Sequence, residues 1–268
     1  MPNIYQNGVG GTLGAQLATV KPLWMSGAVW YVRAGGVDAA SPAGRNREYP
    51  LATIAQAVTN AADGDIVCLL DGHLETIAVE QAVAKKLCFI GEGSAAGQPT
   101  VQLTLNATAT NLFYVTASFV EFHNIKFRQS TAANSGSRIA VAATDLLVDG
   151  CYFECGNQDT SAMSFAGSSD RARIRNTTVI SVATTAPQPA AGITTIGALA
   201  DLELDGLVLN AGTIGFSNYF ALNASAGAIT RLRGINCSLL NGADVKFHAS
   251  TTGRFNAGVV TGGSRVEW

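Results

Sequence analysis

The chain has 268 residues, of which 47% are hydrophobic and only 13% are charged, with a formal net charge of −2. This length and apolar content suffice for one large domain or two small ones. The absence of a basic patch or an acidic tail argues against nucleic-acid binding and against a partner recruited by charge. The abundance of Gly and the low aromatic content of 7% are typical of short strands broken by many turns.

Residues 1–28 are predicted to form an N-terminal arm or anchor outside the folded domain. Their stretch "GVGGTLGAQ" lacks the strand and helix context of a phosphate-binding loop. No basic region followed by an apolar run marks a secretory signal, and no apolar window of about 18 residues marks a membrane span. The arm carries scattered apolar side chains that we expect to bind a partner: Ile4, Leu13, Leu17, Leu23 and Trp24.

A short amphipathic helix is predicted near residues 51–62. In "YPLATIAQAVTNAADGD", Leu51, Ile54 and Val58 recur at helical spacing. Pro50 suits a helix start, and "DGD" ends the pattern. Strand-like segments, "DIVCLL" and "KKLCFIGEG", come next. A helix ahead of a stack of strands would cover the open end of that stack, which otherwise exposes its core and an unpaired edge.

A six-residue pattern recurs through the rest of the chain. The copies are "FHNIKF" (122–127), "VDGCYF" (148–153), "IRNTTV" (174–179), "LDGLVL" (204–209) and "LRGINC" (232–237), with a weaker sixth, "FNAGVV", at 255–260. Strand-like segments that repeat every 26 to 30 residues predict a solenoid. We therefore expect an all-β fold, a right-handed parallel β-helix over roughly residues 65–262, inside a domain that spans 29–268.

The third residue of each good copy is Asn or Gly, the two residues that best tolerate a left-handed backbone. These anchors are Asn124, Gly150, Asn176, Gly206 and Gly234. A turn at the anchor changes which residues face inward, so the apolar positions on its two sides form separate inward columns. The column three residues after the anchor holds Phe127, Phe153, Val179, Leu209 and Cys237.

Three acids lie together in "DLELDGLVLNAG", namely Asp201, Glu203 and Asp205. Such a strand suits either a catalytic or metal-binding cluster, or the outer face of the repeat. The repeat places Arg173, Glu203 and Arg231 in one outer column, and Arg175, Asp205 and Arg233 in the next. Opposite charges in neighbouring strands attract. We therefore favour a structural ladder of alternating charge over a catalytic acid pair.

The remaining acids and histidines do not form a convincing site. The acids Asp145, Asp149 and Glu154 lie around a turn with arginines in the next coil, and Asp170 with Arg171 resembles a loop pair. The histidines are predicted at separate places: His73 in a turn, His123 on an outer column and His248 near the last coil. We predict no catalytic residue, no metal and no cofactor.

The five cysteines are irregularly spaced and contain no CxxC pair, which argues against zinc. Cys151 and Cys155 on one strand would lie about 13 Å apart, too far for a disulfide. The cysteines are therefore expected to be small, buried, reduced side chains. Trp24, Trp30 and Trp268 lie at the ends of the chain, where docking or packing of the cap is the expected role.

The segment that begins "WYVRAGG" and ends "YPLATIAQAVTNAADGDIVCLLDGHLET" resembles the opening of pectate-lyase-like right-handed β-helix proteins. That fold serves lyases, hydrolases, tailspikes and head-decoration proteins, so the resemblance implies a fold more strongly than an activity. The variant "GHLET", with His73 where the enzymes usually have Tyr, is similar to sequences of tailed-phage virion structural proteins.

The resemblance implies two classes of function. Enzymes with this fold act on acidic polysaccharides through calcium-binding or paired carboxylates, and the coils carry no acid cluster without neighbouring arginines. We therefore expect a non-enzymatic phage virion structural protein, a homotrimeric capsid decoration protein on the outer surface of the head. Its partners would be itself and the major capsid or another virion protein, with no nucleic acid or membrane, and assembly in the host cytoplasm. The alternative is a tailspike-like or pectate-lyase-like protein that binds or cleaves acidic polysaccharide.

Overall fold

The computed structural model describes residues 27–38, 43–106, 111–128, 136–157, 160–184, 191–213, 215–216, 220–224, 227–241, 243–247, 249–261 and 266–267. The five apolar residues predicted to bind a partner, Trp24 among them, precede this part of the chain, and His248 and Trp268 also lie outside it. No helix in the described part is long and apolar enough to cross a membrane.

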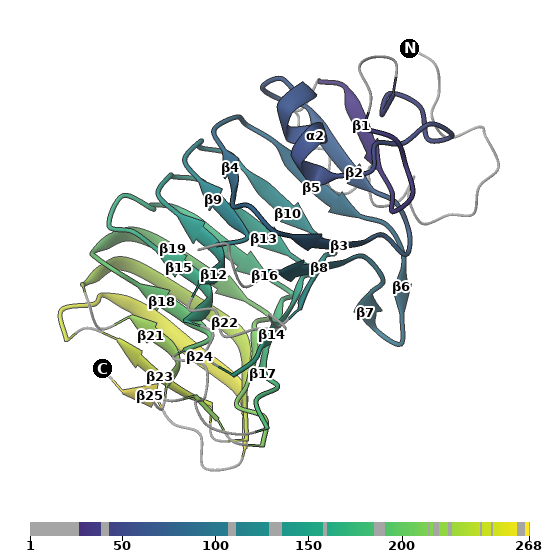
Figure 1. Ribbon diagram of the computed structural model, residues 1–268. Helices are drawn as coiled ribbons and strands as arrows, with labels where there is room; N and C mark the ends of the chain where they lie inside the picture. Colours follow the sequence, from purple (N-terminus) through teal and green to yellow (C-terminus); the bar gives the residue numbers. More distant parts are fainter. Residues whose placement is uncertain are drawn as a thin grey trace.

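Three parallel strand ladders wind into a β-helix (Figure 1). The first ladder contains β1 (Val29–Val32), β2 (Ile66–Leu69), β5 (Cys88–Gly91), β10 (Glu121–His123), β13 (Leu147–Asp149), β16 (Ala172–Arg175), β19 (Leu199–Asp205), the first part of β22 (Ile229–Leu240) and β24 (Gly253–Val260). The second contains β3 (Leu74–Ile77), β8 (Gln102–Leu105), β11 (Lys126–Arg128), β14 (Tyr152–Cys155), β17 (Thr178–Ser181), β20 (Val208–Asn210) and the last part of β22.

The third ladder contains β4 (Gln81–Val83), β9 (Phe113–Val115), β12 (Ser137–Val141), β15 (Ser161–Phe165), β18 (Ile193–Thr195), β21 (Phe220–Ala224), β23 (Asp244–Phe247) and β25 (Val266–Glu267). Apart from these ladders, β6 (Ser94–Ala95) and β7 (Gln98–Pro99) form a small antiparallel pair. The predicted all-β parallel β-helix, with a short helix at its N-terminal end, is confirmed.

The turn between the first and second ladders lies at the predicted anchor in four coils. Asn124, Gly150, Asn176 and Gly206 all have positive φ angles, between 46° and 65°. In the next coil the left-handed residue is Asn236, not the predicted Gly234. The fifth copy of the repeat was therefore aligned two residues too early, because "GINCSL" rather than "LRGINC" carries the turn.

Gly234 has a different role from the anchors. It pairs with Leu204 on an inward column, and a Cβ at this position would lie 2.4 Å from the Phe255 ring of the next coil. A glycine is therefore needed so that Phe255 can pack there. The sequence pattern treated Gly234 as a turn residue because glycine serves both purposes.

The inward columns fill the centre of the coils with apolar side chains. Phe127, Phe153, Val179 and Leu209 are register partners in successive strands, as predicted, and Leu239 rather than Cys237 follows them. The rings of Phe127 and Phe153 stack with centroids 4.5 Å apart. This column continues through five coils, so the core is a single stack along the solenoid.

The capping helix α2 (Ile54–Asn60) is shorter than predicted. Leu51 pairs with Val32 as an extension of the sheet edge, and Thr53 is the N-cap whose hydroxyl accepts from Gln56 N. Pro50 therefore precedes the sheet edge and does not begin the helix. Ile54 is fully buried against the first coil, so α2 covers the N-terminal end of the core as expected (Figure 1).

Both ends of α2 are fixed by side chains from the first coils. At the N-terminus, the Glu75 carboxylate accepts from Ile54 N at 3.0 Å and lies 3.0 Å from His73 Nε2. At the C-terminus, Lys85 Nζ donates to the carbonyls of Val58, Thr59 and Ala61. A carboxylate at the N-terminus and an ammonium at the C-terminus both complement the helix dipole.

Candidate functional site

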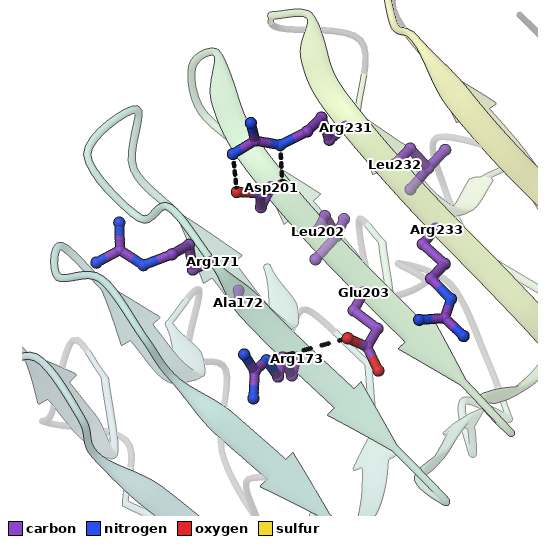
Figure 2. A pocket seen from close by; sticks show the side chains of 9 residues that line it. All are labelled: Arg171, Ala172, Arg173, Asp201, Leu202, Glu203, Arg231, Leu232 and Arg233. Atoms are coloured by element: carbon purple, nitrogen blue, oxygen red, sulfur yellow. Dashed lines mark hydrogen bonds and ion pairs between the residues drawn. The ribbon is translucent and has the colours of Figure 1, made fainter.

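The charged outer face of β16, β19 and β22 forms a shallow groove of about 340 Å³. Figure 2 shows its charged side chains on the three neighbouring strands, alternating with Ala172, Leu202 and Leu232, which belong to the buried core. The lining residues are Arg171, Ala172, Arg173, Asp201, Leu202, Glu203, Arg231, Leu232 and Arg233. Four of the six residues of the predicted charge ladder line this groove, and the other two, Arg175 and Asp205, follow on β16 and β19.

The strand register confirms one half of the predicted ladder. Arg173 lies opposite Glu203, and Arg175 lies opposite Asp205, in adjacent coils. The ion pairs cross over between these columns, because Arg175 Nη2 donates to Glu203 Oε1 at 2.8 Å while Arg173 Nε is 4.0 Å from the other oxygen. Both arginines of β16 therefore lie within ion-pair distance of the Glu203 carboxylate.

The other half of the ladder is two residues away from its predicted register. Arg231 lies opposite Asp201, and Arg233 lies opposite Glu203, so Asp205 has Ile235 as its partner. The displaced turn at Asn236 causes this shift, because the whole strand before the turn moves with it. Asp205 instead accepts a hydrogen bond from Asn236 Nδ2 at 3.2 Å.

The closest pair in the groove is Arg231 with Asp201. Arg231 Nε donates to Asp201 Oδ1 at 2.6 Å, and Nη2 donates to the second oxygen (Figure 2). These hydrogen bonds hold the pKa of the Asp201 carboxyl below its usual range, although burial acts in the opposite direction. A bidentate guanidinium–carboxylate pair of this kind keeps the acid ionised and oriented.

The groove carries an excess of positive charge. Its lining includes four arginines and two acids, and Arg233 makes no ion pair among the described residues. In the next coil Arg233 lies opposite Arg254, a like charge. Two neighbouring guanidinium groups without a carboxylate between them favour an anionic ligand.

The other acids that were considered for catalysis are also engaged. Asp145 accepts two hydrogen bonds from Arg171, which lower its pKa, and Asp149 accepts from Asn176 Nδ2 at 3.0 Å. Glu154 lies 2.7 Å from Lys126 Nζ in the neighbouring strand.

The predicted loop pair between Asp170 and Arg171 is wrong. The Asp170 carboxylate caps the backbone N–H of Ala200, and Arg171 turns toward Asp145 in the neighbouring coil. The adjacent positions in the sequence suggested a local contact, but the neighbouring coils provide nearer partners for both side chains.

Two histidines lie in environments that the sequence did not indicate. His73 follows a turn, as predicted, yet it is fully buried beside Glu75. His123 lies on an outer column, but it is 5% exposed and 2.9 Å from the Glu121 carboxylate. Trp30 is buried at the cap, where its indole N–H donates to Asp65.

Comparison with known proteins identifies the architecture. No protein-family model matches the chain, and no curated protein matches it. Among solved structures, it is similar to a rhamnogalacturonan lyase, with a TM-score of 0.52 and 10% identity over 83% of this chain and 69% of that one. A pectate lyase gives a TM-score of 0.41 and 12% identity over 88% of this chain and 78% of that one. The chain has a parallel β-helix fold similar to that of the rhamnogalacturonan lyase. At such low identity the likeness concerns the fold alone, so the function of this β-helix has to be argued from its own side chains.

Proposed function

We propose that this β-helix is a non-enzymatic structural component of a tailed-phage particle, a homotrimeric decoration protein on the outer surface of the head. The observation that carries the proposal is the neutralisation of the acids on its outer face. Asp201 and Glu203 are both bound by arginines from adjacent coils. Glycoside cleavage by paired carboxylates needs one acid that holds a proton and a second that acts on substrate. The lowered pKa of Asp201 opposes the first role, and the ion pairs oppose the second.

The cap motif supports the same proposal. The "GHLET" sequence resembles virion structural proteins, and in this chain its His73 and Glu75 fix the start of α2. This contact explains the motif through the stability of the capped end rather than through catalysis. A decoration protein outside a particle needs a stable folded body, and a closed core end contributes to that.

Attachment to the particle is assigned to residues 1–28. Their apolar side chains, listed above, would contact the major capsid protein or a neighbouring subunit. Three copies of such an arm on one trimer would bind a lattice multivalently, so weak individual contacts suffice for firm attachment. We expect the arm to bind an apolar patch on the surface of the assembled shell.

The test measures binding to phage particles stripped of this protein. Full-length protein, a truncation spanning 29–268, and an arm variant with Leu13, Leu17 and Trp24 changed to Ser are compared by cosedimentation. The variant Arg173→Gln is the matched control, since it changes the groove and leaves the arm intact. We expect the control to bind like the natural chain and both arm variants to lose binding. Equal binding by all four would refute the arm, and a monomeric mass in solution would refute the trimer.

A second candidate function rests on the excess of arginine in the groove. Arg233, which makes no ion pair among the described residues, and the neighbouring Arg254 favour binding of an acidic polysaccharide along the outer face. One solved structure of similar fold is a rhamnogalacturonan lyase, which makes a carbohydrate a ligand class to test. Binding of polygalacturonate is measured with and without Arg233→Gln, and release of unsaturated products is measured in parallel. Binding that depends on Arg233 supports this candidate, and product release would replace the structural proposal by an enzymatic one.

A further inference from the structure

Three metal-ligating side chains converge on the outer face of the first ladder, away from the charged groove. Cys88 on β5 is the direct register partner of Glu121 on β10. His123 follows Glu121 by two residues and therefore projects from the same side of the strand. The ligand atoms of these three residues all lie within 4.8 Å of one another, and the three side chains are buried.

The three groups meet at a single oxygen atom. His123 Nε2 lies 2.9 Å from Glu121 Oε2, and Cys88 Sγ lies 3.9 Å from the same oxygen. In a tetrahedral zinc site with bonds of about 2.0 to 2.3 Å, neighbouring ligand atoms are separated by about 3.3 to 3.8 Å. The observed separations lie on both sides of these values. Shifts of roughly 0.4 Å would therefore bring these two contacts to the spacing of zinc ligands.

The charge balance of this cluster also favours a cation. Glu121 is 7% exposed, and His123 is the only basic group within ion-pair distance of it in the described part of the chain. A buried carboxylate is costly unless it is paired. The neighbours on the same face are apolar, since Ile66 and Ile90 pack with Cys88 in a separate small cluster. Such surroundings strengthen the attraction between a carboxylate and an ion.

We propose that Cys88, Glu121 and His123 form a binding site for a borderline-soft divalent transition metal, with zinc as the preferred ion. A sulfur, an imidazole nitrogen and a single carboxylate suit zinc or cobalt, whereas calcium and magnesium require several oxygen ligands. Cys68, the nearest other thiol on this face, is 3.6 Å from a Glu92 oxygen. The site therefore takes three ligands from the described residues, and the fourth position is left for water.

The test uses the full-length protein after treatment with a chelator. Cobalt(II) is titrated first because tetrahedral cobalt with a thiolate ligand gives intense visible bands and a charge-transfer band in the near ultraviolet. Zinc is then added as a competitor, and metal per chain is counted by elemental analysis. We expect one cobalt per chain, the thiolate band, and displacement by zinc. A spectrum of hexahydrated cobalt alone would overturn the site.

Variants assign the ligands. Cys88→Ser is expected to abolish the charge-transfer band, and Glu121→Gln and His123→Gln are expected to weaken binding at least 10-fold. Cys151→Ala is the matched control, because Cys151 is also a buried thiol but lies on an inward column. A band that persists in Cys88→Ser, or that disappears in Cys151→Ala while the fold is retained, contradicts the assignment.

A measurement on the natural chain keeps the proposal testable if these variants do not fold. Zinc bound at the site should protect Cys88 from alkylation in moderate denaturant, while the alkylation of Cys237 is unchanged. Mass spectrometry of the digested protein measures both residues in one sample. Zinc should also raise the thermal midpoint by mass action. Equal alkylation of Cys88 with and without zinc would overturn the proposal.

Discussion

Arg231 lies directly opposite Asp201 in the neighbouring coil, and its guanidinium donates to both oxygens of that carboxylate. The repeat pattern had placed Arg231 opposite Glu203, two residues further along. The pair therefore shows the true register of the strand that carries the fifth copy of the repeat. In this register Arg233 lies opposite Glu203, yet it makes no ion pair among the described residues.

The Arg231–Asp201 pair is expected to contribute little to stability. Asp201→Asn should lower the free energy of unfolding by about 0.2 to 1 kcal/mol, because the pair is exposed and screened by solvent. Asp205→Asn, which keeps its contact with Asn236, is the matched control and should change less. Urea denaturation at low and high salt measures both. A loss above about 2 kcal/mol, or a loss that salt does not reduce, would contradict a surface role.

Stability is expected to fall in acid through Asp145 and Asp201, whose pKa values are both lowered by hydrogen bonds from arginines. A carboxyl whose pKa is lowered by folding binds fewer protons in the folded state. Its contribution to the free energy of unfolding is therefore fully present above the pKa of the unfolded chain, near 3.9. That contribution disappears as pH falls through the folded values. Between pH 2 and 6, the free energy of unfolding should therefore depend less steeply on pH in the double variant Asp145→Asn, Asp201→Asn. Identical pH profiles would refute this origin.

Lys85 is expected to stabilise the capped end of the solenoid. It donates to three carbonyls at the C-terminus of α2, and hydrogen bonds from a charged group are stronger than neutral ones. Lys85→Met should cost about 1.5 to 3 kcal/mol. The adjacent Lys86→Met serves as control, since Lys86 makes no contact with those carbonyls. Hydrogen exchange of α2 should accelerate in Lys85→Met only, and equal rates would show that the helix is held by its buried face alone.

The stacked phenylalanines are expected to dominate the stability of the central coils. Phe153 is fully buried and stacks on Phe127. Phe153→Ala should cost about 3 to 5 kcal/mol through lost burial and the cavity that remains. Val260→Ala, at a position that is 49% exposed, is the control and should change stability by less than about 0.5 kcal/mol. Comparable losses in the two variants would mean that the column is not the core.

The thiols are expected to be inert in the folded protein. Burial raises the pKa of Cys151 to about 12 and that of Cys237 to about 11, and all five cysteines are buried. Because the thiolate is the reactive form, a colorimetric thiol reagent at pH 8 should react slowly with the native chain. It should react with five thiols per chain in urea. Fast reaction of several thiols without denaturant would show that the coils open readily.

The sequence predicted the coil pattern well where packing fixes it. The columns through Phe127 and Phe153 and the turns at Asn124 and Asn176 follow from side-chain size and backbone preference, which are local properties. The fifth copy of the repeat was misaligned because Gly234 satisfies the turn pattern. A glycine is required at this position because the ring of Phe255 leaves no room for a Cβ. That constraint comes from the next coil and leaves no local signal.

The cluster of Cys88, Glu121 and His123 was missed for a related reason. Cys88 and Glu121 are 33 residues apart, which is longer than the 26 to 30 residues of the repeats used for alignment. His123 was assigned to an outer column, which suggested exposure to water. Outer columns of the first coils are buried, however, as the 1% exposure of Ile90 shows. The alternation of side chains along a strand predicts whether a residue points inward or outward. It does not predict whether another part of the chain covers the outer face.

The ladder topology has a consequence for how the chain folds and unfolds. Each strand pairs only with its equivalents in the coils before and after it, so a coil is completed only when the chain has returned to the same side. Growth from one formed coil to the next is then a sequential process, with stability that accumulates along one dimension. The helix-capped end, with its side-chain contacts to α2, is the natural starting point. The exposed residues of β24 mark the opposite end as the place where opening begins. A pulling force or a protease would therefore remove coils one after another, from the end that carries β24.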